Sequence, residues 1–201
     1  MATPPKGGSN ESPSRTADSS PRERLLAVAS RLFYDEGVHV VGIDRIIDEA
    51  GVAKASLYSN FGSKDGLVRA YLEEHFEARQ ECVASVLTKH DSPRDQLLGL
   101  FDDIGTALKS PAFRGCRFLN ASAEARPDES VVVVTEEYRT WLRTTFTDLA
   151  KAAGATNPTR LGRQLALLYD GAAMAARVDE DRAGAAEAAR TAAAALIDAA
   201  G

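Results

Sequence analysis

The stretch that decides the fold runs from Gly42 to Lys64 and reads GIDRIIDEAGVAKASLYSNFGSK. Its first part places Ile43, Ile46, Ile47 and Ala50 on one face of a short helix. Gly51 then supplies a residue that enters the left-handed backbone conformation without steric cost. A second short helix is predicted from about residue 54 to residue 60. Two short helices joined by a tight corner predict a helix-turn-helix.

The second of these helices is predicted to have a polar outer face. Leu57 and Phe61 point to the core, and no Asp or Glu occurs from residue 52 to residue 64 in a chain with 29 acidic and 24 basic residues. The net charge of -5 argues against non-specific coating of nucleic acid, so we expect a defined docking surface for the major groove. The residues predicted to contact double-stranded DNA are Arg45, Lys54, Ala55, Ser56, Tyr58, Ser59, Asn60 and Lys64. Among them Tyr58 and Lys64 are predicted phosphate contacts.

The segment resembles the DNA-binding domain of the TetR/AcrR family of bacterial transcriptional regulators. The residues in register with the family pattern are Ile46, Ala50, Gly51, Val52, Lys54, Leu57, Tyr58, Phe61, Ser63, Lys64 and Leu67. Three positions depart from it, because Gly42 and Ala53 replace the usual Ser or Thr caps and Asn60 stands where His is common. An Ala in place of a Ser cap costs about 1 kcal/mol, so we expect weaker capping and an intact motif.

The rest of the chain shows helical periodicity, which predicts an all-α fold of about nine helices. Residues 1–20 are rich in Pro, Gly and Ser and are predicted to be a disordered tail. Residues 21–66 form the predicted DNA-binding domain, with its motif at about 44–63, and 67–201 the effector-binding and dimerisation domain. The run from Val131 to Val134 is β-branched, but its apolar stripe continues to Leu149 and predicts a helix.

The resemblance implies a homodimer that responds to a small-molecule effector. Each aromatic residue of the middle helices is more readily explained as core, but together they make an apolar cavity plausible. The predicted effector contacts are Phe101, Ile104, Phe118, Asn120, Tyr138 and Trp141. The last two helices are rich in small side chains, which reflects either a dimer surface or helix propensity alone. The predicted dimer contacts are Leu161, Leu165, Leu168, Ala172, Ala189, Ala193 and Leu196.

The histidines and cysteines have two interpretations, a redox or metal sensor and ordinary packing. His75 and Cys82 share a face of one helix, and Cys116 could approach them, but scattered ligands of this kind are more readily explained as packing residues. We therefore predict no metal and no cofactor, and leave a redox role for Cys82 or Cys116 open. Two distant cysteines and no membrane-length apolar run favour a cytoplasmic protein without a membrane partner.

The sequence thus predicts a one-component DNA-binding regulator, a repressor that an apolar or amphipathic effector releases from a palindromic operator. One alternative is an effector-independent DNA-binding activator. Another is an all-helical enzyme. The chain contains no HExxH, GxSxG, GxxxxGK or strand-linked GxGxxG motif, so we predict that it is not an enzyme.

Overall fold

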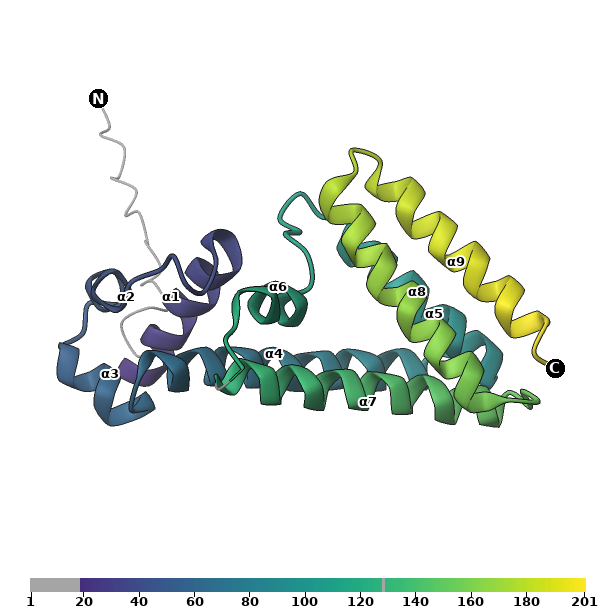
Figure 1. Ribbon diagram of the computed structural model, residues 1–201, viewed down its shortest axis with the longest axis horizontal. Coiled ribbons are helices and arrows are strands. Elements are labelled where there is room, and N and C mark those ends of the chain that lie inside the picture. Colours follow the sequence, from purple (N-terminus) through teal and green to yellow (C-terminus); the bar gives the residue numbers. More distant parts are fainter. Residues whose placement is uncertain (1–18, 128) are drawn as a thin grey trace, which may run out of the picture.

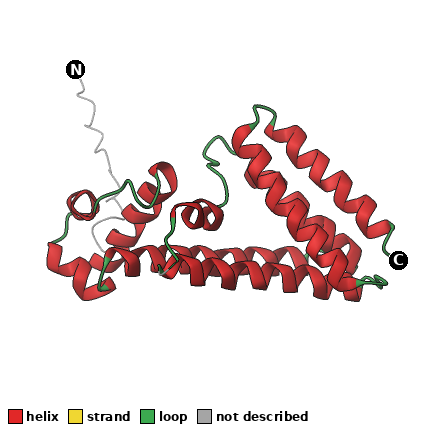
Figure 2. Cartoon of the chain, in the orientation of Figure 1, coloured by secondary structure: helices red, strands yellow, loops and turns green. Residues whose placement is uncertain are grey.

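The computed structural model describes residues 19–127 and 129–201. Within these ranges the chain forms nine α-helices and no strand (Figure 1, Figure 2), which confirms the all-α prediction. The predicted tail lies outside the described residues except for its last two positions. The helices are α1 (Pro21–Glu36), α2 (Ile43–Ala50), α3 (Lys54–Phe61), α4 (Lys64–Thr88), α5 (Pro93–Leu108), α6 (Arg117–Glu124), α7 (Ser130–Ala152), α8 (Pro158–Val178) and α9 (Arg182–Asp198).

Caps and glycines set the ends of the first three helices. Ser20 and Glu23 form a capping box at the start of α1. Gly51 ends α2 in the left-handed conformation, with φ 61° and ψ 43°, as predicted. Gly42 and Ala53 cap α2 and α3 without a side-chain hydrogen bond, so the weak capping is also confirmed. These two short helices therefore depend on packing for their stability.

The long helix α4 connects the two ends of the molecule. It packs against α1, α3, α5 and α7, and the contact with α7 begins at its first turn, where Asp65 meets Ser130. Figure 1 shows α4 and α7 lying side by side along the length of the molecule. The predicted domain division between residues 66 and 67 falls inside this continuous helix. No linker therefore separates the two ends of the molecule along α4.

The C-terminal helices form the other end of the molecule. α8 packs on α7 and on α9, and α9 packs on α5 (Figure 1). The run from Val131 to Val134 lies in the first turn of α7, so the helical prediction for it is confirmed. None of the helices within the described ranges has the length and hydropathy needed to cross a bilayer.

Candidate functional site

The outer side of α3 is a small polar surface. Leu57 is fully buried and fixes the helix on the core, while the Tyr58 side chain remains 46% exposed. An aromatic side chain left this open is available to a partner. The structure places most of the predicted DNA contacts of this helix in solvent, with Ser56 half-buried and the following residues exposed: Lys54, Ala55, Tyr58, Ser59 and Asn60.

The polar groups of α3 have local partners in the free protein. Lys54 Nζ lies 2.8 Å from Asp44 Oδ1 in α2, and this hydrogen bond raises the pKa of Lys54. The side chains of Ser59 and Asn60 both donate to the carbonyl of Ser56, at 3.1 and 2.7 Å. All three groups are solvent-exposed, so a partner can replace these contacts at small cost.

Arg45 has a different environment from the other predicted DNA contacts. Its guanidinium donates to both carboxylate oxygens of Glu36 and to Glu49, which also binds Arg31. Hydrogen bonding to Glu36 is the largest cause of the raised pKa of Arg45. This network joins the end of α1 to α2, and it compensates the charge of Arg45 internally.

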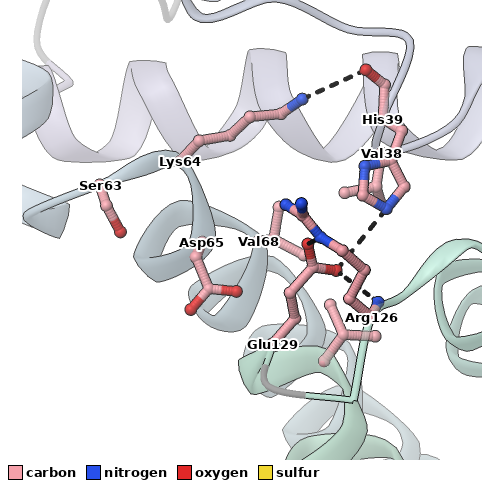
Figure 3. A pocket seen from close by; sticks show the side chains of 9 residues that line it. Val38, His39, Ser63, Lys64, Asp65, Val68, Arg126 and Glu129 are labelled. Carbon is pink, nitrogen blue, oxygen red and sulfur yellow. Dashed lines mark hydrogen bonds and ion pairs between the residues drawn. The ribbon is translucent and has the colours of Figure 1, made fainter.

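Lys64, at the start of α4, is half-buried beside the loop that follows α1. Its ammonium donates to the carbonyl of His39 at 3.4 Å, and desolvation lowers the pKa of Lys64 (Figure 3). Lys64 forms no ion pair with any described residue. Glu124 and Glu129 lie near enough to act on its charge, but neither pairs with it directly, and Lys64 stays a predicted phosphate contact.

The pocket that Lys64 lines lies between the first helices and the segment before α7. Its volume is about 360 Å³, and its wall includes His39, Arg126 and Glu129. Figure 3 shows His39 Nε2 directed toward Glu129 Oε2, at 3.6 Å. Asp65 accepts a hydrogen bond from the Ser130 amide at 3.2 Å. These contacts connect the helix-turn-helix directly to the start of α7.

One basic residue beside α3 was not predicted as a contact. The guanidinium carbon of Arg22 lies 5.4 Å from the centre of the Phe61 ring, at the end of α3. Arg22 is exposed, so the contact keeps a positive charge next to the polar surface. The sequence does not indicate this position, because Arg22 lies in the first turn of the first helix. Only the packing of α1 on α3 brings it next to the polar surface.

A second pocket lies among α4, α5, α6, α7 and α8. Its volume is about 260 Å³, and its wall includes three of the predicted effector contacts, Ile104, Phe118 and Tyr138. The rings of Phe118 and Tyr138 stack at 3.9 Å with an angle of 7° between their planes. We refer to this pocket as the central cavity. Its aromatic wall is the surface that the sequence predicted in general terms.

The other three predicted effector contacts lie elsewhere. Phe101 is buried against Phe146 and Tyr169, so it belongs to the core. Trp141 packs on Phe76 and Tyr138 and is one layer removed from the cavity wall. Asn120 lines a separate depression, where its side chain binds the Arg114 carbonyl and the Arg177 guanidinium. Phe101, Asn120 and Trp141 thus do not line the central cavity, and their role as effector contacts stays a prediction.

The central cavity also has polar wall residues that were not predicted as effector contacts. From α4 come His75, Arg79 and Cys82, whose spacing of four and three residues places them on one helix face. Desolvation, with a smaller effect from Arg117, lowers the pKa of His75 to about 4, so the imidazole is neutral at neutral pH. Cys116 lies on the same wall, and burial raises its pKa. Within residues 19–127 and 129–201 no group of three such side chains could hold a metal ion.

The predicted dimer contacts are mostly inside the subunit. Five of the seven are at most 5% exposed, because they face α5, α7 or the neighbouring C-terminal helix: Leu161, Leu165, Ala172, Ala189 and Ala193. Leu168 and Leu196 are partly buried. The exposed apolar stripe of α8 instead consists of Leu167 (62%), Met174 (53%) and Val178 (69%). These residues recur at seven and four positions and so lie on one face of the helix. In the single chain the predicted residues are thus mostly used by the subunit core, and both the residues and the helices of the dimer interface stay a prediction.

Comparison with known proteins identifies relatives of the first four helices. The profile of the family described as "Bacterial regulatory proteins, tetR family" matches residues 25–71. The transcriptional activator FasR of Mycolicibacterium smegmatis is 38% identical over 93 residues, which are 46% of this chain and 42% of FasR. The repressor KstR2 of the same organism is 33% identical over 91 residues, which are 45% of this chain and 43% of KstR2. The match thus spans less than half the length of these curated relatives.

The similarity to a solved structure extends over nearly the whole chain. SCO4454 of Streptomyces coelicolor, described as a TetR-family transcriptional regulator, superposes with a TM-score of 0.85. The two chains are 34% identical, and the match covers 90% of this chain and 95% of SCO4454. The likeness therefore includes the C-terminal helices as well as the helix-turn-helix.

Proposed function

This chain belongs to the TetR family of transcriptional regulators, and from this premise we propose that it is a homodimeric repressor that a small molecule releases from operator DNA. The observation that carries the proposal is the exposed, acid-free outer side of α3 on a buried Leu57 anchor. TetR-family regulators bind operator DNA and dimerise, and they are not enzymes. Since a repressor works on the chromosome, the proposed location is the cytoplasm.

In the proposed complex α3 lies in the major groove. Lys54, Ser56 and Ser59 approach base edges, with Ala55 and Asn60 beside them, because these groups occupy the outer side of the helix. Tyr58, Lys64 and Arg22 bind phosphates on either side of the groove. Arg45 has a supporting role, since Glu36 and Glu49 already compensate its charge.

The proposed dimer forms through α8 and α9. A two-fold axis places two copies of α3 at half-sites about one helical turn of DNA apart. The stripe of Leu167, Met174 and Val178 supports this interface, because three large apolar side chains exposed on one helix face are costly in water. The exposed residues of α9 include Ala188 and Ala195, whose small side chains allow close approach of a partner helix.

The effector is proposed to act through α6, which contacts both the central cavity and the loop between α1 and α2. Phe118, in its first turn, lines the central cavity, and Glu124, at its end, accepts a hydrogen bond from the His39 amide at 3.0 Å. A ligand that favours a different position of α6 therefore changes the support of the loop between α1 and α2. Such a ligand shifts the equilibrium only by the difference between its affinities for the two states.

Repression is proposed over activation on simple physical grounds. A repressor needs only to occupy its operator, whereas an activator needs a further surface for the transcription machinery. Both outputs occur among relatives, because FasR is named an activator and KstR2 a repressor. Transcription in vitro from the bound promoter distinguishes the two, since a repressor lowers the amount of transcript and ligand restores it. Full transcript without ligand would favour the effector-independent activator.

A gel shift tests the proposed DNA binding. The probe is the DNA upstream of the protein's own gene, at about physiological salt and with excess unrelated DNA as competitor. We expect a retarded band that the double variant Lys54→Ala, Tyr58→Ala loses and that Lys89→Ala, at the far end of α4, retains. Absence of a specific band across the upstream region, or equal competition by unrelated DNA, would count against the proposal.

A further inference from the structure

The central cavity is lined by two arginines whose hydrogen-bonding capacity is only partly used. In the described part of the chain, four buried side-chain nitrogens lack a hydrogen-bond partner, and three of them belong to Arg79 and Arg117. Both side chains line the central cavity. A buried donor without a partner is costly, so a bound molecule that accepts hydrogen bonds from these nitrogens gains affinity.

The carboxylates around the central cavity are already paired. Asp103 accepts a hydrogen bond from Arg79 Nη1 at 2.6 Å, and Asp170 accepts one from Arg139. Arg117 has no carboxylate partner among the residues that the structure describes. Arg79 and Arg139 thus each have a paired carboxylate, and among the described residues Arg117 is the wall arginine that has none. His75 adds no charge at neutral pH, because its imidazole is neutral.

The rest of the wall selects for an apolar or aromatic body. The stacked rings of Phe118 and Tyr138 form one side, and Ile104 and Ala173 lie on the same wall. The volume of about 260 Å³ is slightly below the ~300–1,000 Å³ typical of pockets for drug-sized ligands. The cavity therefore suits a small molecule with one anionic group and an otherwise apolar surface.

We propose that the central cavity binds a small carboxylic acid with an apolar or aromatic body, and that Arg117, assisted by Arg79, receives its carboxylate. A guanidinium presents paired N–H donors that match the two oxygens of a carboxylate. The inference deepens the regulator function proposed above and rests on it only for the effect on DNA. The guanidinium of Arg117 also lies over the ring of Tyr34 in α1. A carboxylate that draws Arg117 into the cavity weakens this contact with the DNA-binding helices.

Calorimetric titration of the full chain without DNA tests the ligand class. The probes are hexanoate, octanoate, phenylpropionate and phenylbutyrate, each compared with its primary amide, which has nearly the same shape and no charge. We expect at least one acid to bind about tenfold or more tightly than its amide, because the charge-assisted hydrogen bonds are lost in the amide. Binding of amides as tight as that of the acids, or no binding of any acid to the folded chain, would overturn the proposal.

Three variants test whether Arg117 causes the preference for the acid over its amide. Arg117→Gln should bind acid and amide with nearly equal affinity, and Arg117→Lys should keep part of the preference for the acid. Arg114→Gln is the matched control, because its side chain lies three residues away and binds the Pro111 carbonyl outside the cavity. Circular dichroism confirms the fold of each variant. A full acid preference in folded Arg117→Gln would contradict the assignment. Since DNA is absent, failure here leaves the gel-shift result intact, and failure of DNA binding leaves the titration intact.

Discussion

The guanidinium carbon of Arg117 lies 3.7 Å from the centre of the Tyr34 ring. Arg117 is part of the wall of the central cavity, and Tyr34 is in α1 of the DNA-binding helices. The Tyr34 hydroxyl also donates to the Gly115 carbonyl at 3.2 Å and accepts from the Arg114 amide at 2.8 Å. A single aromatic side chain thus joins the two sites that the proposed regulation must couple.

Removing the Tyr34 hydroxyl should destabilise the protein measurably. Tyr34→Phe keeps the ring under Arg117 but loses two hydrogen bonds, so we expect the free energy of unfolding to fall by about 1–2 kcal/mol. Tyr34→Leu also removes the cation–π contact and should cost about 0.5–1 kcal/mol more. Urea denaturation at one fixed subunit concentration gives both values. If Tyr34→Phe were as stable as the parent protein, the hydrogen bonds of the Tyr34 hydroxyl would contribute nothing to the packing of α1 on the segment before α6.

Lys64 should contribute one phosphate contact. Lys64→Ala is expected to weaken binding to all DNA sequences and to reduce the slope of log K against log salt by about one, because one fewer counterion is released. Fluorescence anisotropy at several salt concentrations measures both. Lys89→Ala is the control, since it removes an exposed lysine from the opposite end of α4. Unchanged affinity and slope in Lys64→Ala would remove Lys64 from the interface.

The exposed stripe of α8 should control assembly. Leu167→Arg with Met174→Arg is expected to give monomers in sedimentation and to lose operator binding, because one half-site provides too little affinity. Val133→Arg is a matched control, as Val133 on α7 is 51% exposed and Met174 53% exposed. A double variant that remains dimeric would place the interface on another surface.

Acidification should act through His75. Its pKa of about 4 is lower than the ordinary 6.5, so the folded protein binds fewer protons than the unfolded chain between these values. The stability present above pH 6.5 is therefore lost progressively as the pH falls toward 4. His75→Gln keeps a polar partner for Ser30, whose hydroxyl lies 2.8 Å from His75 Nε2, and removes the titration. We expect urea midpoints from pH 7.5 to 4.5 to fall less in the variant. Parallel curves would rule out His75 as the cause.

Local signals explain why the helices were predictable from the sequence. Pro93 and Pro158 each follow a residue whose side chain caps the helix, and both helices begin there. The corner at Gly51 and the inward position of Leu57 likewise depend only on neighbours in the chain. The outer side of α3 could therefore be predicted with its residues.

Tertiary packing explains what was missed. α8 carries two apolar stripes, and the sequence does not indicate that the stripe of Leu161 and Leu165 is used by the subunit core while Leu167 and Met174 remain exposed. Arg117 reaches the cavity wall from α6, which has only eight residues. A helix this short shows too few turns for its apolar spacing to indicate which residues face a cavity. The pairing of Arg45 with Glu36 also depends on how α1 and α2 cross.

The proposed function requires two copies of α3 to read a two-fold symmetric DNA site. Selection of bound sequences from a random DNA pool by the purified full chain, followed by footprinting of the selected site, measures this directly. We predict an inverted repeat whose two protected halves lie on one face of the duplex about one helical turn apart, and no enrichment by the Lys54→Ala, Tyr58→Ala variant. Enrichment of a site without two-fold symmetry, or selection of the same site by the α3 variant, would contradict the proposed function.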